Sequence, residues 1–311
     1  MKKLMICALA LMTATTMFGQ IRFDQSGNGN TGGGSQGPGT SNYFYIVQNG
    51  NNNDGEIHQW GANNDGFMDQ RGDGNVGKID QDGRWNSSTL RQLGDFNYSC
   101  VEQIGNNNGY DVNQIGDFNY NYGLQVGNWN NADVHQIGDA NLAYNEQHGN
   151  RNDFDLNQTG DSNLSYSISV GNINKVDVDQ LGDSNASIID QDGNRHSATV
   201  FQLGDGNYAE VFQEGRRNTS TMSQIGDFNY AFTKQDGRRN RNISSQNGNS
   251  NLNHTEQTGN DNLVNITQNG NFLKNYTYQT GNLNSVTGTQ TGNGHCAITT
   301  QSGNGNTVVF F

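Results

Sequence analysis

The stretch QLGDGNYAEVFQEGRRNTSTMSQ, residues 202–224, contains the motif Gln-x-Gly-x-x-Asn twice, beginning at Gln202 and again at Gln213. Between these two glutamines the residues alternate in character, as they do in a β-strand with a period of two. We expect one face of this strand to be buried, and it carries Asn207, Ala209, Val211 and Gln213. The other face, which we expect to meet solvent, carries Tyr208, Glu210 and Phe212.

The same motif recurs every 11 residues from Gln48 to Gln301 without insertion or deletion, which makes 24 units. Gly stands at the third place in all 24 units, and Gln leads 23 of them, with Ser169 as the exception. Asn stands five places after the leading residue in 21 units, the exceptions being His196, Leu273 and His295. A fixed period of this kind indicates a stacked repeat architecture and argues against a disordered low-complexity tract in the assembled state. The newly secreted monomer is still open to the disordered interpretation.

A second, longer period is superimposed, because Asp follows the glycine in alternate units only. We therefore take the physical repeat as two consecutive units that form unlike halves, and each half has room for one strand and one tight turn. The sequence predicts an all-β fold, an amyloid-like cross-β solenoid of about twelve 22-residue coils in which Gly, Asp and Asn make the turns. The turn glycines that we single out are Gly94, Gly105, Gly116, Gly138, Gly204 and Gly226. The aspartates should form one acidic column along a turn edge: Asp73, Asp95, Asp117, Asp139, Asp161, Asp183, Asp205 and Asp227.

Stacked coils would place each amide side chain above the next at a strand spacing of roughly 4.8 Å. Side-chain amides can then form hydrogen-bonded ladders beside the backbone ladders, which satisfies polar groups that would otherwise be costly to bury. The glutamines that we assign to this core amide ladder are Gln92, Gln103, Gln114, Gln125, Gln136, Gln202, Gln213 and Gln224. The asparagines are Asn97, Asn119, Asn141, Asn207 and Asn229.

Composition argues against an ordinary globular core, and taken alone it would point to disorder, an interpretation that the fixed period overturns. Only 31% of the 311 residues are apolar, the mean hydropathy is −0.85, and Gly occurs 42 times. A formal net charge of −13 argues against nucleic acid or an anionic membrane as a partner, because both require clustered Lys and Arg. No stretch after the N-terminus is apolar enough to insert into a membrane.

The N-terminus has the order of a secretory signal peptide, with Lys2 and Lys3, an apolar run and a short polar end. We assign residues 1–19 to the signal peptide, 20–47 to a flexible Gly/Asn-rich segment, and 48–311 to the repeat solenoid. A plain linker is the alternative interpretation of residues 20–47. Two cysteines outside the signal peptide, Cys100 and Cys296, are too far apart in the array to predict a disulfide framework.

The repeat resembles that of the curlins, the subunits of curli fibres, whose pattern is Gln-x-Gly-x-x-Asn-x-Ala-x-x-x-Gln. The match is close at Gln202, Gly204, Asn207, Ala209 and Gln213, and the resemblance covers residues 48–311. The chain departs from it at Asn130, His196 and Asn218, where curlins usually have Ser, and in having more coils than a typical curlin. The resemblance implies a secreted subunit of an extracellular amyloid fibre for biofilm matrix and adhesion. It also implies an outer-membrane secretion channel, guided by residues 20–47, and a nucleator subunit as partners.

Function in a solenoid of this kind should lie at its ends and edges. We expect an uncapped polymerisation edge at Val308, Val309, Phe310 and Phe311, where an open strand is a template for the next molecule. The acidic column could make assembly respond to acid or divalent cations, or Asp could only cap the turns. Outward aromatics, namely Phe96, Phe118, Phe228, Tyr98, Tyr120 and Tyr230, could mediate adhesion or lateral bundling, or only stack between coils.

We expect no enzyme, cofactor or metal site. The six histidines fall at unrelated places in the repeat, and none pairs with a repeated Cys or Ser as a nucleophile would require. A fibre subunit that polymerises with itself is the favoured function. The alternatives are a fibre-nucleating minor subunit and a monomeric surface-binding β-solenoid adhesin.

Overall fold

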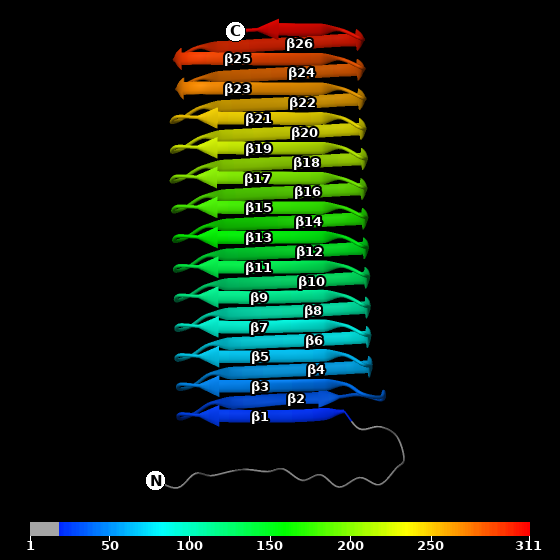
Figure 1. The fold of residues 1–311 in the computed structure, drawn as a ribbon, viewed down its shortest axis with the longest axis vertical. Helices are drawn as coiled ribbons and strands as arrows, with labels where there is room; N and C mark the ends of the chain where they lie inside the picture. The colour runs from blue at the N-terminus through cyan, green and yellow to red at the C-terminus, as the bar shows by residue number, and fades with distance from the viewer. Residues whose placement is uncertain (1–18) are drawn as a thin grey trace.

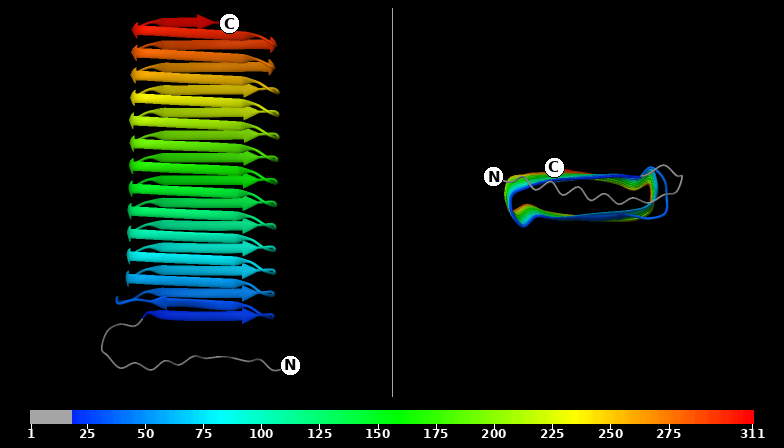
Figure 2. Two further views of the ribbon diagram at one scale, coloured as in Figure 1. Left: turned by 180° about the vertical axis from the view of Figure 1, so that it is seen from behind. Right: turned by 90° about the horizontal axis from the view of Figure 1, so that it is seen from below.

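The computed structural model describes residues 19–311, so the predicted signal peptide lies outside the described residues except for Gly19. The described chain forms 27 parallel strands and no helix, wound into a flattened β-solenoid of about thirteen coils (Figure 1). Each coil contributes one strand to each of two sheets, which face each other across a thin core (Figure 2). The predicted all-β solenoid with a 22-residue repeat is confirmed.

The odd-numbered strands form a 14-stranded sheet. Its members are β1 Gln20–Ser26, β3 Tyr43–Asn49, β5 Asp65–Arg71, β7 Ser87–Leu93, β9 Gly109–Ile115, β11 Asn131–Ile137, β13 Asp153–Thr159, β15 Lys175–Leu181, β17 Ser197–Leu203, β19 Thr219–Ile225, β21 Arg241–Asn247, β23 Leu263–Asn271, β25 Ser285–Asn293 and β27 Thr307–Phe310.

The even-numbered strands form a 13-stranded sheet. Its members are β2 Thr31–Gln36, β4 Asp54–Ala62, β6 Val76–Arg84, β8 Tyr98–Asn106, β10 Tyr120–Asn128, β12 Leu142–Asn150, β14 Leu164–Asn172, β16 Ala186–Asn194, β18 Tyr208–Arg216, β20 Tyr230–Arg238, β22 Leu252–Asn260, β24 Lys274–Asn282 and β26 Cys296–Asn304.

Residues 20–47 differ from the expectation of a flexible segment, because they form β1, β2 and most of β3. Gln25 of β1 pairs with Gln48 of β3, just as Gln48 pairs with Gln70 of β5. The chain from Gln25 to Gln48 is one residue longer than the chain from Gln48 to Gln70. The sequence signal for this coil was the motif at Gln25, Gly27 and Asn30, which lies one position out of the 11-residue frame. The repeat therefore begins one coil earlier than expected, and the count rises from twelve to about thirteen.

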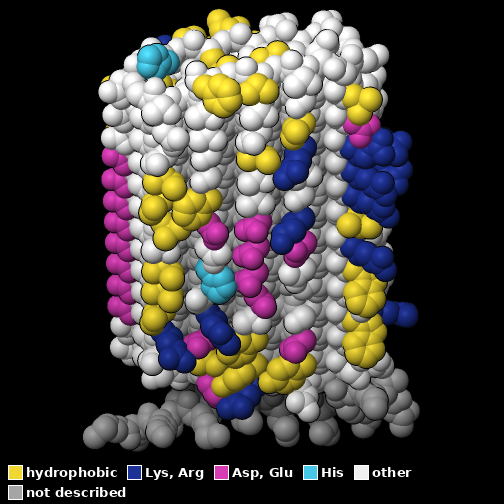
Figure 3. All heavy atoms as spheres, turned by 45° about the horizontal axis from the view of Figure 1, so that its top comes forward, with side chains coloured by type: hydrophobic (Ala, Val, Ile, Leu, Met, Phe, Trp, Pro, Cys, Tyr) yellow, Lys and Arg dark blue, Asp and Glu magenta, His cyan; other side chains and the backbone are white. Residues whose placement is uncertain are grey.

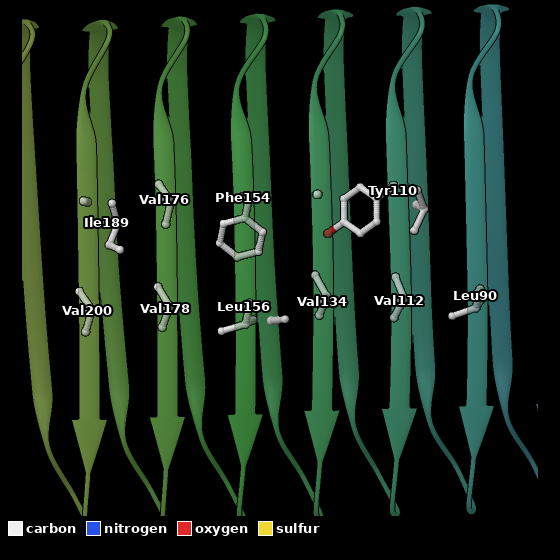
Figure 4. Close-up of a cluster of buried hydrophobic side chains, with 14 of the residues drawn as sticks. Leu90, Tyr110, Val112, Val134, Phe154, Leu156, Val176, Val178, Ile189 and Val200 are labelled. Atoms are coloured by element: carbon white, nitrogen blue, oxygen red, sulfur yellow. The ribbon is translucent and has the colours of Figure 1, made fainter.

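The inward side chains alternate along each strand as predicted, and Asn207, Ala209, Val211 and Gln213 are all buried. Branched side chains, one per coil, form a row through the core, which Figure 4 shows from Leu90 to Val200. Where a large ring enters the thin core, the facing position is small. A Cβ on Gly123 would lie 2.1 Å from the buried ring of Tyr110, so the glycine makes room for the tyrosine.

Candidate functional site

The predicted glutamines lie in two buried columns, one in each sheet. Gln92, Gln114, Gln136, Gln202 and Gln224 belong to odd-numbered strands, and Gln103, Gln125 and Gln213 belong to even-numbered strands. The Nε2 group of Gln92 donates to Oε1 of Gln114 in the next coil at 2.9 Å and to the carbonyl oxygen of Val76 across the core at 3.1 Å. Both amide hydrogens are thus used, and the bond to the next glutamine points toward the C-terminal end of the stack.

The predicted asparagines lie in one column, at the turn that leads from each odd-numbered strand to the next even-numbered strand. Asn97 joins three coils: its backbone N–H donates to Oδ1 of Asn75 at 2.9 Å, and its Nδ2 donates to the carbonyl oxygen of Gly116 at 2.7 Å. The Nδ2 groups of the other four make the same bond to a glycine of the next coil at 2.7–2.8 Å: Asn119, Asn141, Asn207 and Asn229.

The predicted turn glycines all have positive φ, as a tight reversal requires. The values run from 106° at Gly226 to 127° at Gly105, with Gly94, Gly116, Gly138 and Gly204 between them. A Cβ on Gly116 would lie 2.2 Å from the carbonyl oxygen of Gly138 in the next coil. Glycine is therefore required here both by backbone conformation and by the close approach of stacked turns.

The eight aspartates of the acidic column line one narrow edge of the solenoid, visible as the magenta column in Figure 3. They are Asp73, Asp95, Asp117, Asp139, Asp161, Asp183, Asp205 and Asp227. In each case Oδ1 accepts the backbone N–H of the preceding coil, at 2.7 Å for Asp73 to Asp95 and 3.0 Å for Asp205 to Asp227. Asn249 makes the same bond to the N–H of Asp227 at 2.9 Å, so the structural task does not need a charge.

The outward aromatics stack along the solenoid axis. Phe96 lies on Phe118 with ring centroids 5.3 Å apart, and Tyr98 lies on Tyr120 at 4.9 Å. Tyr230 stacks on Tyr208 at 5.4 Å, whereas Phe228 is 68% exposed. Stacking between coils thus accounts for the paired rings, and their proposed part in adhesion or bundling stays a prediction.

The residues expected at the polymerisation edge lie in and just after β27, which pairs with β25. Val308 and Phe310 face inward and pack against Val264, Ile266 and Val286. The outward side chains are Val309, which is 55% exposed, and Phe311, which is 99% exposed.

A second charged edge was not singled out from the sequence. Seven arginines lie on the narrow edge opposite the acidic column, at the last residues of even-numbered strands and in the turns that follow them (Figure 3). They are Arg84, Arg151, Arg195, Arg216, Arg217, Arg238 and Arg239. The sequence could have predicted this edge, since in this half of the repeat Arg often stands at the third and fourth places after the leading glutamine.

The described residues hold few of the groups that chemistry would need. They contain no group of three or more His, Cys, Asp or Glu side chains placed to hold a metal ion. Cys100 and Cys296 are free cysteines, in β8 and β26. Between residues 19 and 311 no helix is long and apolar enough to cross a membrane.

The fold and its ladders define a class, the parallel β-solenoids whose coils are joined through buried side-chain amides. Five segments of the chain match the curlin associated repeat, at residues 61–94, 149–182, 171–204, 197–226 and 204–237. The chain is therefore a curlin-repeat protein, which confirms the resemblance inferred from its motif. No curated protein matches the chain. Both the repeat family and the solenoid fold are structural in character and not enzymatic.

Proposed function

We propose that this protein is a secreted structural subunit that assembles end to end into extracellular curli-like amyloid fibres, which serve biofilm matrix and adhesion. The curlin associated repeats support a curli-type fibre subunit. The secretory character of residues 1–19 supports export, and a secretion channel in the outer membrane and a nucleator subunit would be its partners. Residues 20–47 would then have two roles, as the segment that the channel recognises and as the first coil after folding.

The observation that carries this proposal is the polarity of the glutamine ladders. At one end of the described solenoid, the Nε2 groups of Gln290 and Gln301 donate across the core to Lys274 and Ser285, both at 3.0 Å. Inside the stack, the second amide hydrogen of each glutamine is donated to Oε1 of the glutamine in the next coil. At this end of the described solenoid no further glutamine follows, so the second amide hydrogen of Gln290 and of Gln301 faces outward.

The opposite end carries the matching acceptors. Gln25 and Gln36 donate into the stack, to Gln48 at 2.6 Å and Gln59 at 3.1 Å. No hydrogen bond among residues 19–311 reaches the Oε1 atoms of Gln25 and Gln36. The donor of Gln301 therefore complements the acceptors that Gln25 and Gln36 offer in another copy, whereas β27, which carries no glutamine, lies between Gln290 and any strand added to its sheet. Unpaired strand edges on both faces add backbone donors and acceptors.

Seeded growth tests the proposal. The purified chain should form fibres that bind thioflavin and give the cross-β spacing of roughly 4.8 Å by diffraction. Val309→Lys should slow elongation from preformed seeds, because it puts a charge on an exposed edge strand. Leu203→Lys is the matched control, since Leu203 is also outward and 42% exposed but lies inside the stack, and it should elongate normally.

The same experiment separates the alternatives. A minor subunit would add few copies of itself but would shorten the lag of another subunit's assembly. A monomeric surface-binding adhesin would stay monomeric at high concentration and would not bind thioflavin, and that result would overturn the fibre proposal.

A further inference from the structure

The two charged edges of the solenoid occupy the same stretch of its length. The acidic column runs from Asp73 to Asp227, and the arginine edge runs from Arg84 to Arg239. Outside that stretch the acidic column has no Asp and the opposite edge has no Arg. The acidic column continues as Asn51 at one end and as Asn249, Asn271 and Asn293 at the other. The arginine edge continues as Ala62 at one end and as Asn260 and Asn282 at the other.

Neither edge is neutralised by its own molecule. No ion pair within residues 19–311 involves any of the eight aspartates. On the arginine edge the one ion pair that the described residues form joins Arg239 to Asp261 at 2.6 Å. The guanidinium groups of Arg195 and Arg216 are the main causes that lower the pKa of Arg217, which reports a locally positive field. In the described part of the chain, three acids beside this edge, Asp192, Glu214 and Asp236, form no ion pair with it.

The two edges also share one period along the solenoid axis. Both are built from turns that repeat once per coil, so a carboxylate column and a guanidinium column have the same axial spacing. The arginine edge is grooved: one hollow of about 290 Å³ is lined by Ile173, Arg195 and Arg216, among others. A neighbouring hollow of about 350 Å³ is lined by Trp129 and Arg151, among others.

We propose that the acidic edge of one copy of this chain docks laterally against the arginine edge of a second copy, with the two solenoid axes parallel and without axial shift. In that arrangement Asp183, Asp205 and Asp227 lie level with the turns that carry the densest arginines, Arg195 to Arg239. Each copy keeps one free edge of each sign, so the contact repeats sideways and gives sheets of solenoids. This lateral contact is separate from end-to-end growth, because it uses the edges and not the faces of the stack.

The repeat itself supplies substitutions that remove charge and preserve the fold. Asn249 already replaces Asp in the acidic column with the same hydrogen bond, so Asp183, Asp205 and Asp227 can be changed together to Asn. Asn107 and Asn194 occupy the arginine columns elsewhere, with φ of 57° at Asn107, so Arg195, Arg216 and Arg217 can also be changed to Asn. A matched control changes Asp133, Asp155 and Asp177 to Asn, which removes three charges from the flat face of β11, β13 and β15.

Lateral association is measured by sedimentation velocity for unassembled chains and by fibre width in electron micrographs for assembled ones, while thioflavin fluorescence follows elongation. At about 0.01 M salt, where the Debye length is about 30 Å, the unsubstituted chain and the flat-face control should form lateral stacks. Each edge variant should reduce stacking about tenfold with normal elongation. At about 1 M salt, where the Debye length is about 3 Å, all should separate.

Mixing the two edge variants gives the sharpest outcome. Each retains one intact edge, so an equal mixture should form pairs that do not grow into sheets. The proposal is wrong if the Asp-to-Asn variant stacks like the unsubstituted chain, or if the unsubstituted chain does not associate laterally at low salt. Association that requires added polyphosphate, and that only the Arg-to-Asn variant loses, would assign the arginine edge to a polyanion instead.

Discussion

At the scale of single residues, a buried amide is the side chain best suited to a stack, because it offers a donor and an acceptor along the same axis. The exceptions to the repeat show what this requires. His196 takes the place of an asparagine and reproduces its bonds: Nδ1 accepts the N–H of Asn218 at 3.3 Å, and Nε2 lies 3.1 Å from the carbonyl oxygen of Gly215. Those contacts define a neutral ring with its proton on Nε2.

His196 should make the stability of the solenoid depend on pH. Burial lowers the pKa of His196 below its ordinary value of 6.5, although hydrogen bonds to backbone groups oppose the shift. The unfolded chain therefore takes up a proton first, and the free energy of unfolding should fall as the pH drops below 6.5 and level off below the folded pKa. Denaturant unfolding between about pH 7.5 and 5 measures this loss.

His196→Asn is the matched variant, because it restores the residue that the column uses elsewhere. The difference in unfolding free energy between the two proteins should grow as the pH falls, while titration of the many carboxylates cancels. A constant difference across that range would contradict the prediction.

The roles of Gln, Asn and Gly could be predicted residue by residue, since each recurs so often that its place in the coil follows from the period. The roles of residues that occur at only one place in the repeat array could not be predicted in this way. Nothing in the local sequence pairs Tyr110 with Gly123, which lie in facing sheets, because their contact depends on how the two sheets are offset. Asn145 is similar: it is buried with both amide atoms unpaired at a place that is often branched in other units.

At the scale of elements, one glutamine link joins each pair of neighbouring strands in a sheet from β1 to β26, except that the link from β12 to β14 is missing. Ser169 is too short to continue the ladder: Oγ donates to Gln191 at 3.1 Å, but no bond from Gln147 reaches Ser169. Parallel pairing between β12, β14 and β16 continues through the interruption. The backbone ladder thus tolerates one missing side-chain link.

Ser169→Gln should repair the ladder. The new side chain would accept from Gln147 and would keep the bond to Gln191 that the Ser169 hydroxyl already makes. The one added hydrogen bond should raise the free energy of unfolding by roughly 1 kcal/mol. The midpoint of denaturant unfolding measures the change. Gln125→Ser is the control: it makes the reverse change in the same column and should cost about 1–3 kcal/mol, partly by leaving one amide hydrogen of Gln103 without an acceptor. Equal stability of all three proteins would mean that the ladder contributes nothing.

The first coil marks the limit of prediction at this scale. Residues 36–48 contain one residue more than the frame, in the turn between β2 and β3 that holds Pro38. The fixed step of 11 residues therefore ends at Gln48, although Gln25 and Gln36 carry the same ladder bonds as later units. Turns can absorb an extra residue at little energetic cost, whereas a strand cannot, because a shift of one residue turns every side chain to the other face.

At the scale of the whole molecule, charge is segregated in a way that a single net value conceals. The formal charge of −13 gave no indication of an arginine edge. Sequence spacing alone places two columns on opposite edges only after the 22-residue coil is divided into its two turns. Net charge is thus informative about a globular surface and much less so about a solenoid, in which each column is a separate surface.

The stack as a whole should tolerate loss of a complete coil, because each strand pairs only with strands of adjacent coils. Deleting residues 180–201 joins Asp179 to Gln202, keeps every column in phase and leaves the contact between Tyr110 and Gly123 intact. The variant should fold, retain its strand content by circular dichroism, and lose about 1–3 kcal/mol, the share of one coil at typical stability per residue. Deleting residues 180–195 instead breaks the phase and should abolish cooperative unfolding. If both deletion variants unfold alike, the coils are not independent layers. The register of the ladders and of the charged edges, and with it end-to-end growth, would then have to be set by contacts between distant coils.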